Sequence, residues 1–247
     1  MENKEKSNTK IFNFFKWILI INICIILVFL LLLMRNLIIL NELAEKGKIS
    51  NIEDNLYTKR ILINKDQIWR TEKYLLDNKT LIKNVCIEID SGNVIYNMIS
   101  YYEGDKQIDY FVSDNDEKVY TISNTKGVDK LFEDVTYRKV LSFENLWHLI
   151  KSSAAARIKN VKCNGIDCYK ISGKCLGLEN NEGELYWYID KETGLFVREY
   201  GRNSVKNDIE NGSDVYNMLE DYTYEFGSVT EENFVIPNVE EYKLIGD

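Results

Sequence analysis

The sequence predicts an α+β, mainly β protein, with an N-terminal transmembrane helix followed by an antiparallel sheet that helices cover on one face. Three observations predict this class: an uncharged apolar run near the N-terminus, many β-branched and aromatic segments separated by turn residues, and one segment with helical spacing. The 247 residues are 45% hydrophobic and 12% aromatic, which is enough to bury a core. One globular domain behind an anchor fits this composition.

The apolar run, residues 17–34, reads WILIINICIILVFLLLLM and contains no charged residue. As a helix these 18 residues span about 27 Å, close to the roughly 30 Å hydrocarbon core of a bilayer. A cleaved signal peptide has a shorter apolar core and small residues before the cleavage site, whereas Arg35, Asn36 and a second apolar stretch follow here. We therefore expect a transmembrane signal-anchor helix over residues 11–36, continuing past the bilayer to end near Gly47.

Lysines in the short N-terminal tail, residues 1–10, favour a cytoplasmic N-terminus. The prediction is a single-pass protein of the cell membrane, with residues 37–247 forming an extracytoplasmic domain. The formal net charge of the chain is −8, and residues 1–35 contribute +3, so the domain carries −11. An acidic domain is expected to repel nucleic acid and anionic lipid head groups, which argues against both as electrostatic partners.

Two groups of segments in this domain have strand composition and are separated by Asp, Asn, Gly and Lys clusters, as in an antiparallel meander. The first group is 57–63, 68–75, 81–89, 94–102, 107–112 and 119–122. The second group is 160–163, 168–172, 184–189, 196–200 and 222–226. Asn164-Gly165 is a strong hairpin signal, because both residues tolerate positive φ.

A single helix is predicted between the two groups of strands. Ser142 is its candidate N-cap, and apolar residues follow with the spacing of one helical face. These residues are Phe143, Leu146, Trp147, Ile150, Ala154 and Ile158.

The central strands carry apolar or aromatic residues on both faces. In residues 94–102, Tyr96, Met98 and Tyr102 share one face, and the other face has Ile95, Ile99 and Tyr101. Such strands need cover on both sides. Helices can cover one side, and the other requires curvature, a partner or an apolar ligand. The residues alone leave open whether the sheet fills its own interior with side chains or encloses a ligand.

Three phrases from Asn164 onward, NGIDCYKI, YWYIDKETGLFVREY and DYTYEFGSVTEENFVIPNVEEY, resemble the LolA-like superfamily of outer-membrane lipoprotein-sorting proteins. They resemble in particular its membrane-anchored members in Gram-positive bacteria. The resemblance implies a curved, unclosed β-barrel whose concave apolar face is covered by helices and binds acyl chains or other hydrophobic ligands. It also implies a noncatalytic protein, and some family members are sensory domains of envelope stress responses. The chain has no lipidation site or carrier signal peptide, so a shuttle that leaves the membrane does not follow.

Four of the five cysteines lie outside the apolar run, and we consider them as disulfide candidates in an oxidising compartment. They are Cys86, Cys163, Cys168 and Cys175. Cys163 and Cys168 flank a hairpin turn, so we expect them to face each other within disulfide reach. Cys86 and Cys175 then remain as a second pair.

No motif indicates an enzyme, a cofactor or a metal. His148 is the only histidine and is expected in solvent on the predicted helix. Asp114, Asp116 and Glu117 lack the loop pattern of a calcium site. The sequence therefore predicts no catalytic residue, no cofactor and no metal ligand, and it does not identify the ligand-binding residues.

Two hypotheses follow. The first is a noncatalytic, membrane-tethered domain that binds a hydrophobic ligand such as a lipid or a lipoprotein acyl chain. The alternative is a sensory or scaffolding ectodomain that binds a protein partner in envelope signalling.

Overall fold

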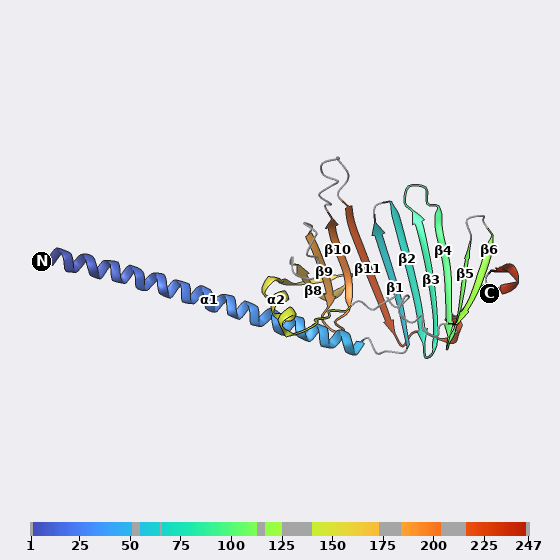
Figure 1. Cartoon of the computed structure of the whole chain (residues 1–247), viewed down its shortest axis with the longest axis horizontal. Coiled ribbons are helices and arrows are strands. Elements are labelled where there is room, and N and C mark those ends of the chain that lie inside the picture. Colours follow the sequence, from blue (N-terminus) through green and yellow to red (C-terminus); the bar gives the residue numbers. More distant parts are fainter. Residues whose placement is uncertain are drawn as a thin grey trace.

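The structure, a computed structural model, describes residues 2–50, 55–64, 66–112, 117–124, 140–172, 184–203 and 216–245. One long helix, α1 (Glu2–Ser50), leads into a broad sheet (Figure 1). Its N-terminal part extends away from the sheet and its C-terminal part runs beside the sheet. Within α1, Phe14–Ser50 contains a stretch that is long and apolar enough to cross a membrane.

All the strands belong to one sheet in the order β12-β6-β5-β4-β3-β2-β1-β11-β10-β9-β8-β7. The strands are β1 (Asn55–Asn64), β2 (Gln67–Leu76), β3 (Lys79–Glu88), β4 (Val94–Glu103), β5 (Lys106–Val112), β6 (Lys118–Asn124), β7 (Arg157–Cys163), β8 (Ile166–Ser172), β9 (Glu184–Asp190), β10 (Phe196–Asn203), β11 (Tyr216–Phe226) and β12 (Lys243–Leu244). Neighbours are antiparallel except β12, which runs parallel to β6. Because β7 and β12 each have one neighbour, the sheet is unclosed, and the predicted mainly β class is confirmed.

The two groups of predicted strands form the two halves of this sheet. β1–β6 are consecutive hairpins on one side, and β7–β11 form the other side. The pairing of β1 with β11 joins the halves, with Arg60 opposite Tyr222. The turns use the residues expected of them: Asn164 has φ +52° and Gly165 has φ +83°.

We call the side of the sheet that carries α1 the helix face, and the other side the opposite face. Leu40 and Leu43 of α1 are 0% and 1% exposed and pack with Ile171, Ile189 and Phe196 of the β7–β11 half. This buried cluster contains no residue of β1–β6. The helices therefore cover only half of the helix face, and the C-terminal part of α1 belongs to the core of the domain.

The second helix is shorter than its apolar pattern predicts. α2 is Leu146–Ala155, and its N-cap is Asn145, whose side chain accepts a hydrogen bond from the backbone N–H of His148 at 2.9 Å. The expectation of Ser142 as the cap was therefore wrong. Ile158 lies in β7, where it alternates with exposed Arg157 and Lys159, so its burial follows strand rather than helix periodicity.

The C-terminal segment, residues 227–245, covers part of the opposite face of β3–β6. Phe234 packs edge-on against Tyr101 at 6.4 Å between ring centroids, and Tyr242 packs against Tyr110 at 5.3 Å. Asn55 holds the start of the segment through two 2.9 Å hydrogen bonds with the backbone of Val229. One of the aromatic faces that needed cover is thus partly covered by the chain itself.

Candidate ligand-binding face

The helix face of β1–β6 carries a continuous band of apolar side chains. The register places Leu62, Trp69, Cys86 and Tyr96 opposite one another across β1–β4. One step along the strands, Met98 lies opposite Phe111 of β5. We call these six residues the apolar band. Neither α1 nor α2 shares a buried cluster with any of them.

Aromatic packing orders the middle of the apolar band. The rings of Trp69 and Tyr96 lie 5.6 Å apart over the strand between them, and Cys86 is fully buried in that strand. The hydroxyl of Tyr96 contacts the sulfur of Met98 at 2.9 Å, while the Tyr96 side chain remains 40% exposed. The result is an apolar surface with a buried base and an exposed rim, which suits a nonpolar ligand.

Polar side chains lie beside the apolar band on the helix face, toward the C-terminal end of β4 and the N-terminal end of β5. Asp109 lies opposite Ser100, and Gln107 donates a hydrogen bond to Asp109 Oδ2 at 2.7 Å. Burial raises the pKa of Asp109, although hydrogen bonds from Ser100 and Gln107 oppose the shift. Burial and the charge of Asp109 raise the pKa of Tyr102 to about 12. This border offers hydrogen-bonding groups beside an apolar surface.

A buried ion pair lies on the helix face where β1 pairs with β11. Both Nε and NH2 of Arg60 donate to Glu220 Oε1, and the Tyr222 hydroxyl donates to Glu220 Oε2 at 2.6 Å. Glu220 and Tyr222 are each 5% exposed. Burial alone would lower the pKa of Arg60, but its bonds to Glu220 outweigh that effect and raise it. Arg60, Glu220 and Tyr222 therefore place a buried ion pair where β1 and β11 join the two halves of the sheet.

The disulfide candidates lie in separate parts of the sheet. Cys163 and Cys168 are free, buried thiols in a small cluster with Val197 on the opposite face. They do not sit directly opposite each other, because Cys163 pairs with Ile166 and Cys168 with Val161. A bond between them stays a prediction. Cys86 is also a free thiol, and burial raises its pKa; Cys175 lies outside the described residues.

Other sequence candidates contribute no chemical site. His148 is half-buried and packs edge-on against Phe143 at 5.8 Å between ring centroids, so the expectation of a solvated side chain was wrong. Glu117 pairs with Lys243 at 3.4 Å, and Asp114 and Asp116 lie outside the described residues. No group of three or more His, Cys, Asp or Glu residues suited to a metal ion occurs within the described part of the chain.

Sequence reasoning found only part of the apolar band. It placed Tyr96 and Met98 on one face, but it did not connect them with Leu62, Trp69 or Phe111. Those residues join the band through the register of four successive strand pairs. Alternation within each strand was the available signal, and the alignment of the strands was missing.

The fold is similar to those of several solved structures. One is MucB, with a TM-score of 0.40 and 10% identity over 81% of this chain and 62% of that chain. Another is the MucA/MucB complex of Pseudomonas aeruginosa, with a TM-score of 0.38 and 8% identity over 85% of this chain and 63% of that chain. This chain thus spans less than two thirds of the length of those proteins.

A LolA-superfamily protein from Nitrosomonas europaea matches with a TM-score of 0.29 and 7% identity over 80% of this chain and 97% of that chain. The superfamily in that structure's description is the one that the three phrases from Asn164 onward resemble. No protein-family model and no curated protein matches the sequence.

Proposed function

We propose that this chain is a noncatalytic, membrane-tethered binding protein that holds a hydrophobic ligand, such as a lipid or a lipoprotein acyl chain, on its apolar band. The single observation that carries the proposal is the band itself, which lies on the half of the helix face that neither α1 nor α2 covers. Side chains of this kind gain about 25 cal/mol for each Å² of apolar surface that a ligand removes from water.

The shape of the apolar band favours an elongated ligand. It crosses five neighbouring strands, β1 to β5, a distance of about 19 Å at the usual strand spacing. Asp109, which is only partly buried and is held by Gln107, lies beside it and can bond a polar group at one end of the ligand. An acyl chain with a polar end group has this combination of properties.

The tether places the binding face outside the cytoplasm. The apolar part of α1 crosses the cell membrane, the short N-terminal tail stays in the cytoplasm, and residues 37–247 lie on the extracytoplasmic side. The exposed apolar surface of α1 and the charge of its N-terminal tail support this arrangement. A tethered domain holds its ligand near the bilayer from which a lipid would come.

Photo-crosslinking tests the proposal on the full chain in detergent. A photoactivatable fatty acid should label peptides that contain Trp69, Cys86 or Tyr96. Met98→Glu should reduce labelling at least fivefold, because the new carboxylate would have to be desolvated beside the acyl chain. Labelling spread over the domain without preference for the apolar band would contradict the proposal.

The matched control is Ile122→Glu. Ile122 is a 50% exposed apolar residue on the opposite face of the same half-sheet, so the charge and side-chain change are alike. This variant should be labelled as strongly as the parent chain. Equal losses in both variants would mean that the added charge, and not the apolar band, determines labelling.

One observation favours a protein partner as a second candidate. At the β3–β4 hairpin, Ile89, Val94 and Ile95 are 43%, 57% and 52% exposed, next to the rim of the apolar band. An apolar hairpin end suits the flat surface of another protein. Crosslinking from residue 95 to a protein in cells, together with no fatty acid labelling of the apolar band, would favour this candidate.

A further inference from the structure

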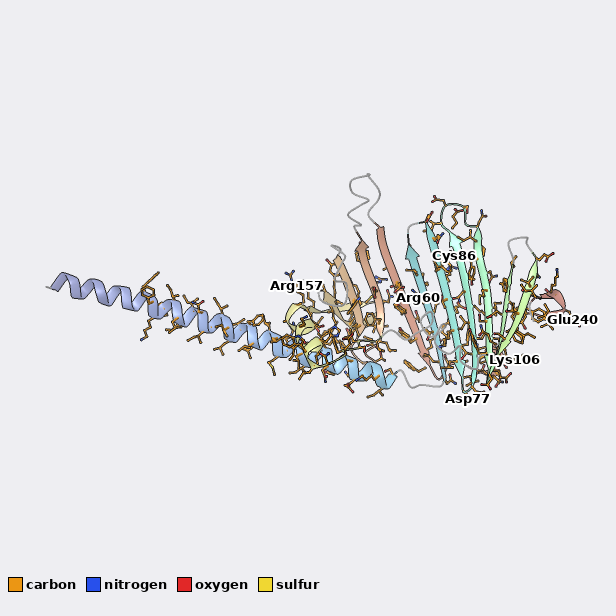
Figure 2. All side chains as sticks on the ribbon, viewed as in Figure 1. Arg60, Asp77, Cys86, Lys106, Arg157 and Glu240 are labelled. Carbon is orange, nitrogen blue, oxygen red and sulfur yellow. The ribbon has the colours of Figure 1, made fainter. Side chains whose placement is uncertain are left out.

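The end of the domain nearest the apolar part of α1 is formed by α2 and the start of β7. Figure 1 shows α2 at this end of the sheet, where α1 leaves the domain. Arg157, the first residue of β7, lies at the same end in Figure 2, and Lys106 lies at the other. Any membrane that α1 crosses would therefore meet α2 and β7 first.

The contact between α1 and α2 fixes the distance between α2 and the apolar run. Asn36 Nδ2 donates to the carbonyl oxygens of Ser153 at 3.0 Å and Ala156 at 2.8 Å, at the C-terminal end of α2. Met34, the last residue of the apolar run, precedes Asn36 by about 3 Å along the helix axis. Leu33 is already partly covered, whereas Met34 is 54% exposed. No linker separates the apolar run from the domain.

The outward side of α2 is apolar at its N-terminal end. Leu149, Ser152 and Ser153 form its buried side. Leu146 and Trp147 are 67% and 65% exposed, and no described residue buries them. α2 is about 15 Å long and is bonded to Asn36 at its C-terminal end, so Leu146 and Trp147 reach the head-group zone that borders the hydrocarbon core when α2 lies along the bilayer surface. Tryptophan is enriched at that depth.

Exposed basic side chains lie on the three elements at this end of the domain. They are Arg35 on α1, Lys151 on α2, and Arg157 and Lys159 on the edge strand β7, where they alternate with the buried Ile158. Among the described residues at this end, Glu144 lies just before α2, and Asp167 pairs with Lys162 at 3.5 Å. The domain as a whole is acidic, but the described residues at the end from which the apolar run leaves carry more basic than acidic side chains.

We propose that α2 and the start of β7 form a second membrane contact, which lies on the same bilayer that α1 crosses. Leu146 and Trp147 enter the interface, and the four basic side chains meet the phosphates of anionic phospholipids. Basic residues close to such a surface are attracted by its negative potential, and the attractions add. The contact rests on the proposed membrane tether, and it fixes the tilt of the domain over the bilayer.

Fluorescence quenching by brominated phospholipids tests the contact in the full chain. The background variant is Trp17→Phe, reconstituted in phosphatidylcholine vesicles with bromine near the glycerol end of the acyl chains. Quenching is expected, and it should be lost when Trp147→Phe is added. Trp69→Phe in the same background is the matched control, since any quenching that it removes reports the apolar band instead.

Charge is tested by adding phosphatidylglycerol to the vesicles. The quenching of Trp147 should rise, and the rise should fall at least twofold in Lys151→Gln/Arg157→Gln. The control, Lys106→Gln/Lys243→Gln, removes the same charge from residues away from α2 and β7 and should behave like the parent. An equal rise in both pairs would overturn the role assigned to the basic side chains.

The native chain, compared with the Trp17→Phe and Trp147→Phe variants, separates failure of the contact from failure of the tether. If Trp17 is quenched and Trp147 is not, the anchor is in the bilayer and the second contact is wrong. If neither tryptophan is quenched, the proposed tether is wrong and the contact falls with it.

Discussion

The buried ion pair between Arg60 and Glu220 gives a residue-scale test of the contact that joins the two halves of the sheet. Arg60→Met would remove a guanidinium that bonds the buried Glu220 carboxylate, although the Tyr222 hydroxyl would still donate to it. We expect a loss of about 3 kcal/mol in the free energy of unfolding, the lower end for breaking a buried pair. Arg60→Met/Glu220→Gln should recover part of this, because a neutral amide still accepts from Tyr222. Urea unfolding of all variants would measure the coupling, and a purely additive result would contradict it.

Two buried acids predict a loss of stability at alkaline pH. Burial raises the pKa of Cys168 to about 12 from its ordinary 9.0, and that of Tyr102 to about 12 from 10.0. Above pH 9 the unfolded chain releases these protons while the folded chain keeps them, so stability falls as pH rises toward 12. Below the unfolded pKa values this contribution is fully present.

Urea midpoints between pH 8 and pH 11 check this slope, with tenfold steps in proton concentration corresponding to about 1.4 kcal/mol per fully linked proton. Cys168→Ala should be less stable throughout, because it leaves a cavity, but its loss between these pH values should be smaller than in the parent. Parallel curves for the two chains would remove Cys168 as a cause.

At the scale of elements, α1 docks on the β9–β10 hairpin through a close backbone approach. Lys46 Nζ donates to the carbonyl of Lys191 at 2.7 Å, and the Ser50 hydroxyl donates to that of Thr193 at 2.9 Å. A Cβ atom at Gly194 would lie 2.5 Å from the backbone nitrogen of Gly47 and closer still to the carbonyl oxygen of Leu43. Glycine is thus required here for space as well as for its φ of +72°.

Gly194→Ala should therefore lower the free energy of unfolding by more than the cost of a positive φ alone. The matched control is Gly92→Ala, since Gly92 has φ +71° and a Cβ atom added there would meet no atom within 4 Å. The control should lose about 1–2 kcal/mol from backbone strain. Gly194→Ala should lose a further 1–3 kcal/mol, roughly the cost of overpacking. Thermal unfolding measures both, and equal losses would contradict the docking.

Elements with a local sequence pattern, such as alternation between turn residues, were predicted well. Segments whose position depends on contacts with distant residues were not. Residues 57–63 and 94–102 show strand alternation and turn residues, so β1 and β4 were expected within two residues of their ends. The C-terminal segment has two short 3₁₀ turns, Glu231–Asn233 and Val239–Glu241, and no period to read. Its position over Tyr101 and Tyr110 depends on a surface that exists only after β3–β6 pair.

The apolar band shows the same limit at the scale of the whole molecule. Alternation predicted that both faces of β4 needed cover, and the structure has Phe234 on one side and the half-exposed Tyr96 on the other. Which face the helices cover follows from contacts between residues more than a hundred positions apart, such as Asn36 with Ala156. No local pattern carries that information.

The burial of the C-terminal part of α1 in the domain gives a whole-molecule prediction. Leu40 and Leu43 are among the most buried side chains of the domain, and Asn36 satisfies two carbonyl oxygens of α2. A chain that begins at residue 34 should therefore fold as a soluble domain, while one that begins at residue 52 should not, because it lacks an element of the core. Burying each leucine contributes about 2 kcal/mol, a large part of a typical domain stability.

Circular dichroism and thermal unfolding of the two truncated chains check this prediction. The matched control for loss of the core is Leu40→Asp in the chain that begins at residue 34, which should unfold like the shorter chain. Ile38→Asp in the same chain changes a 58% exposed residue two positions away and should remain folded. A cooperative transition in the chain from residue 52, equal to that of the longer chain, would show that α1 is only an anchor. The domain would then begin after α1, and the separation between anchor and α2 that fixes the second membrane contact would lose its basis.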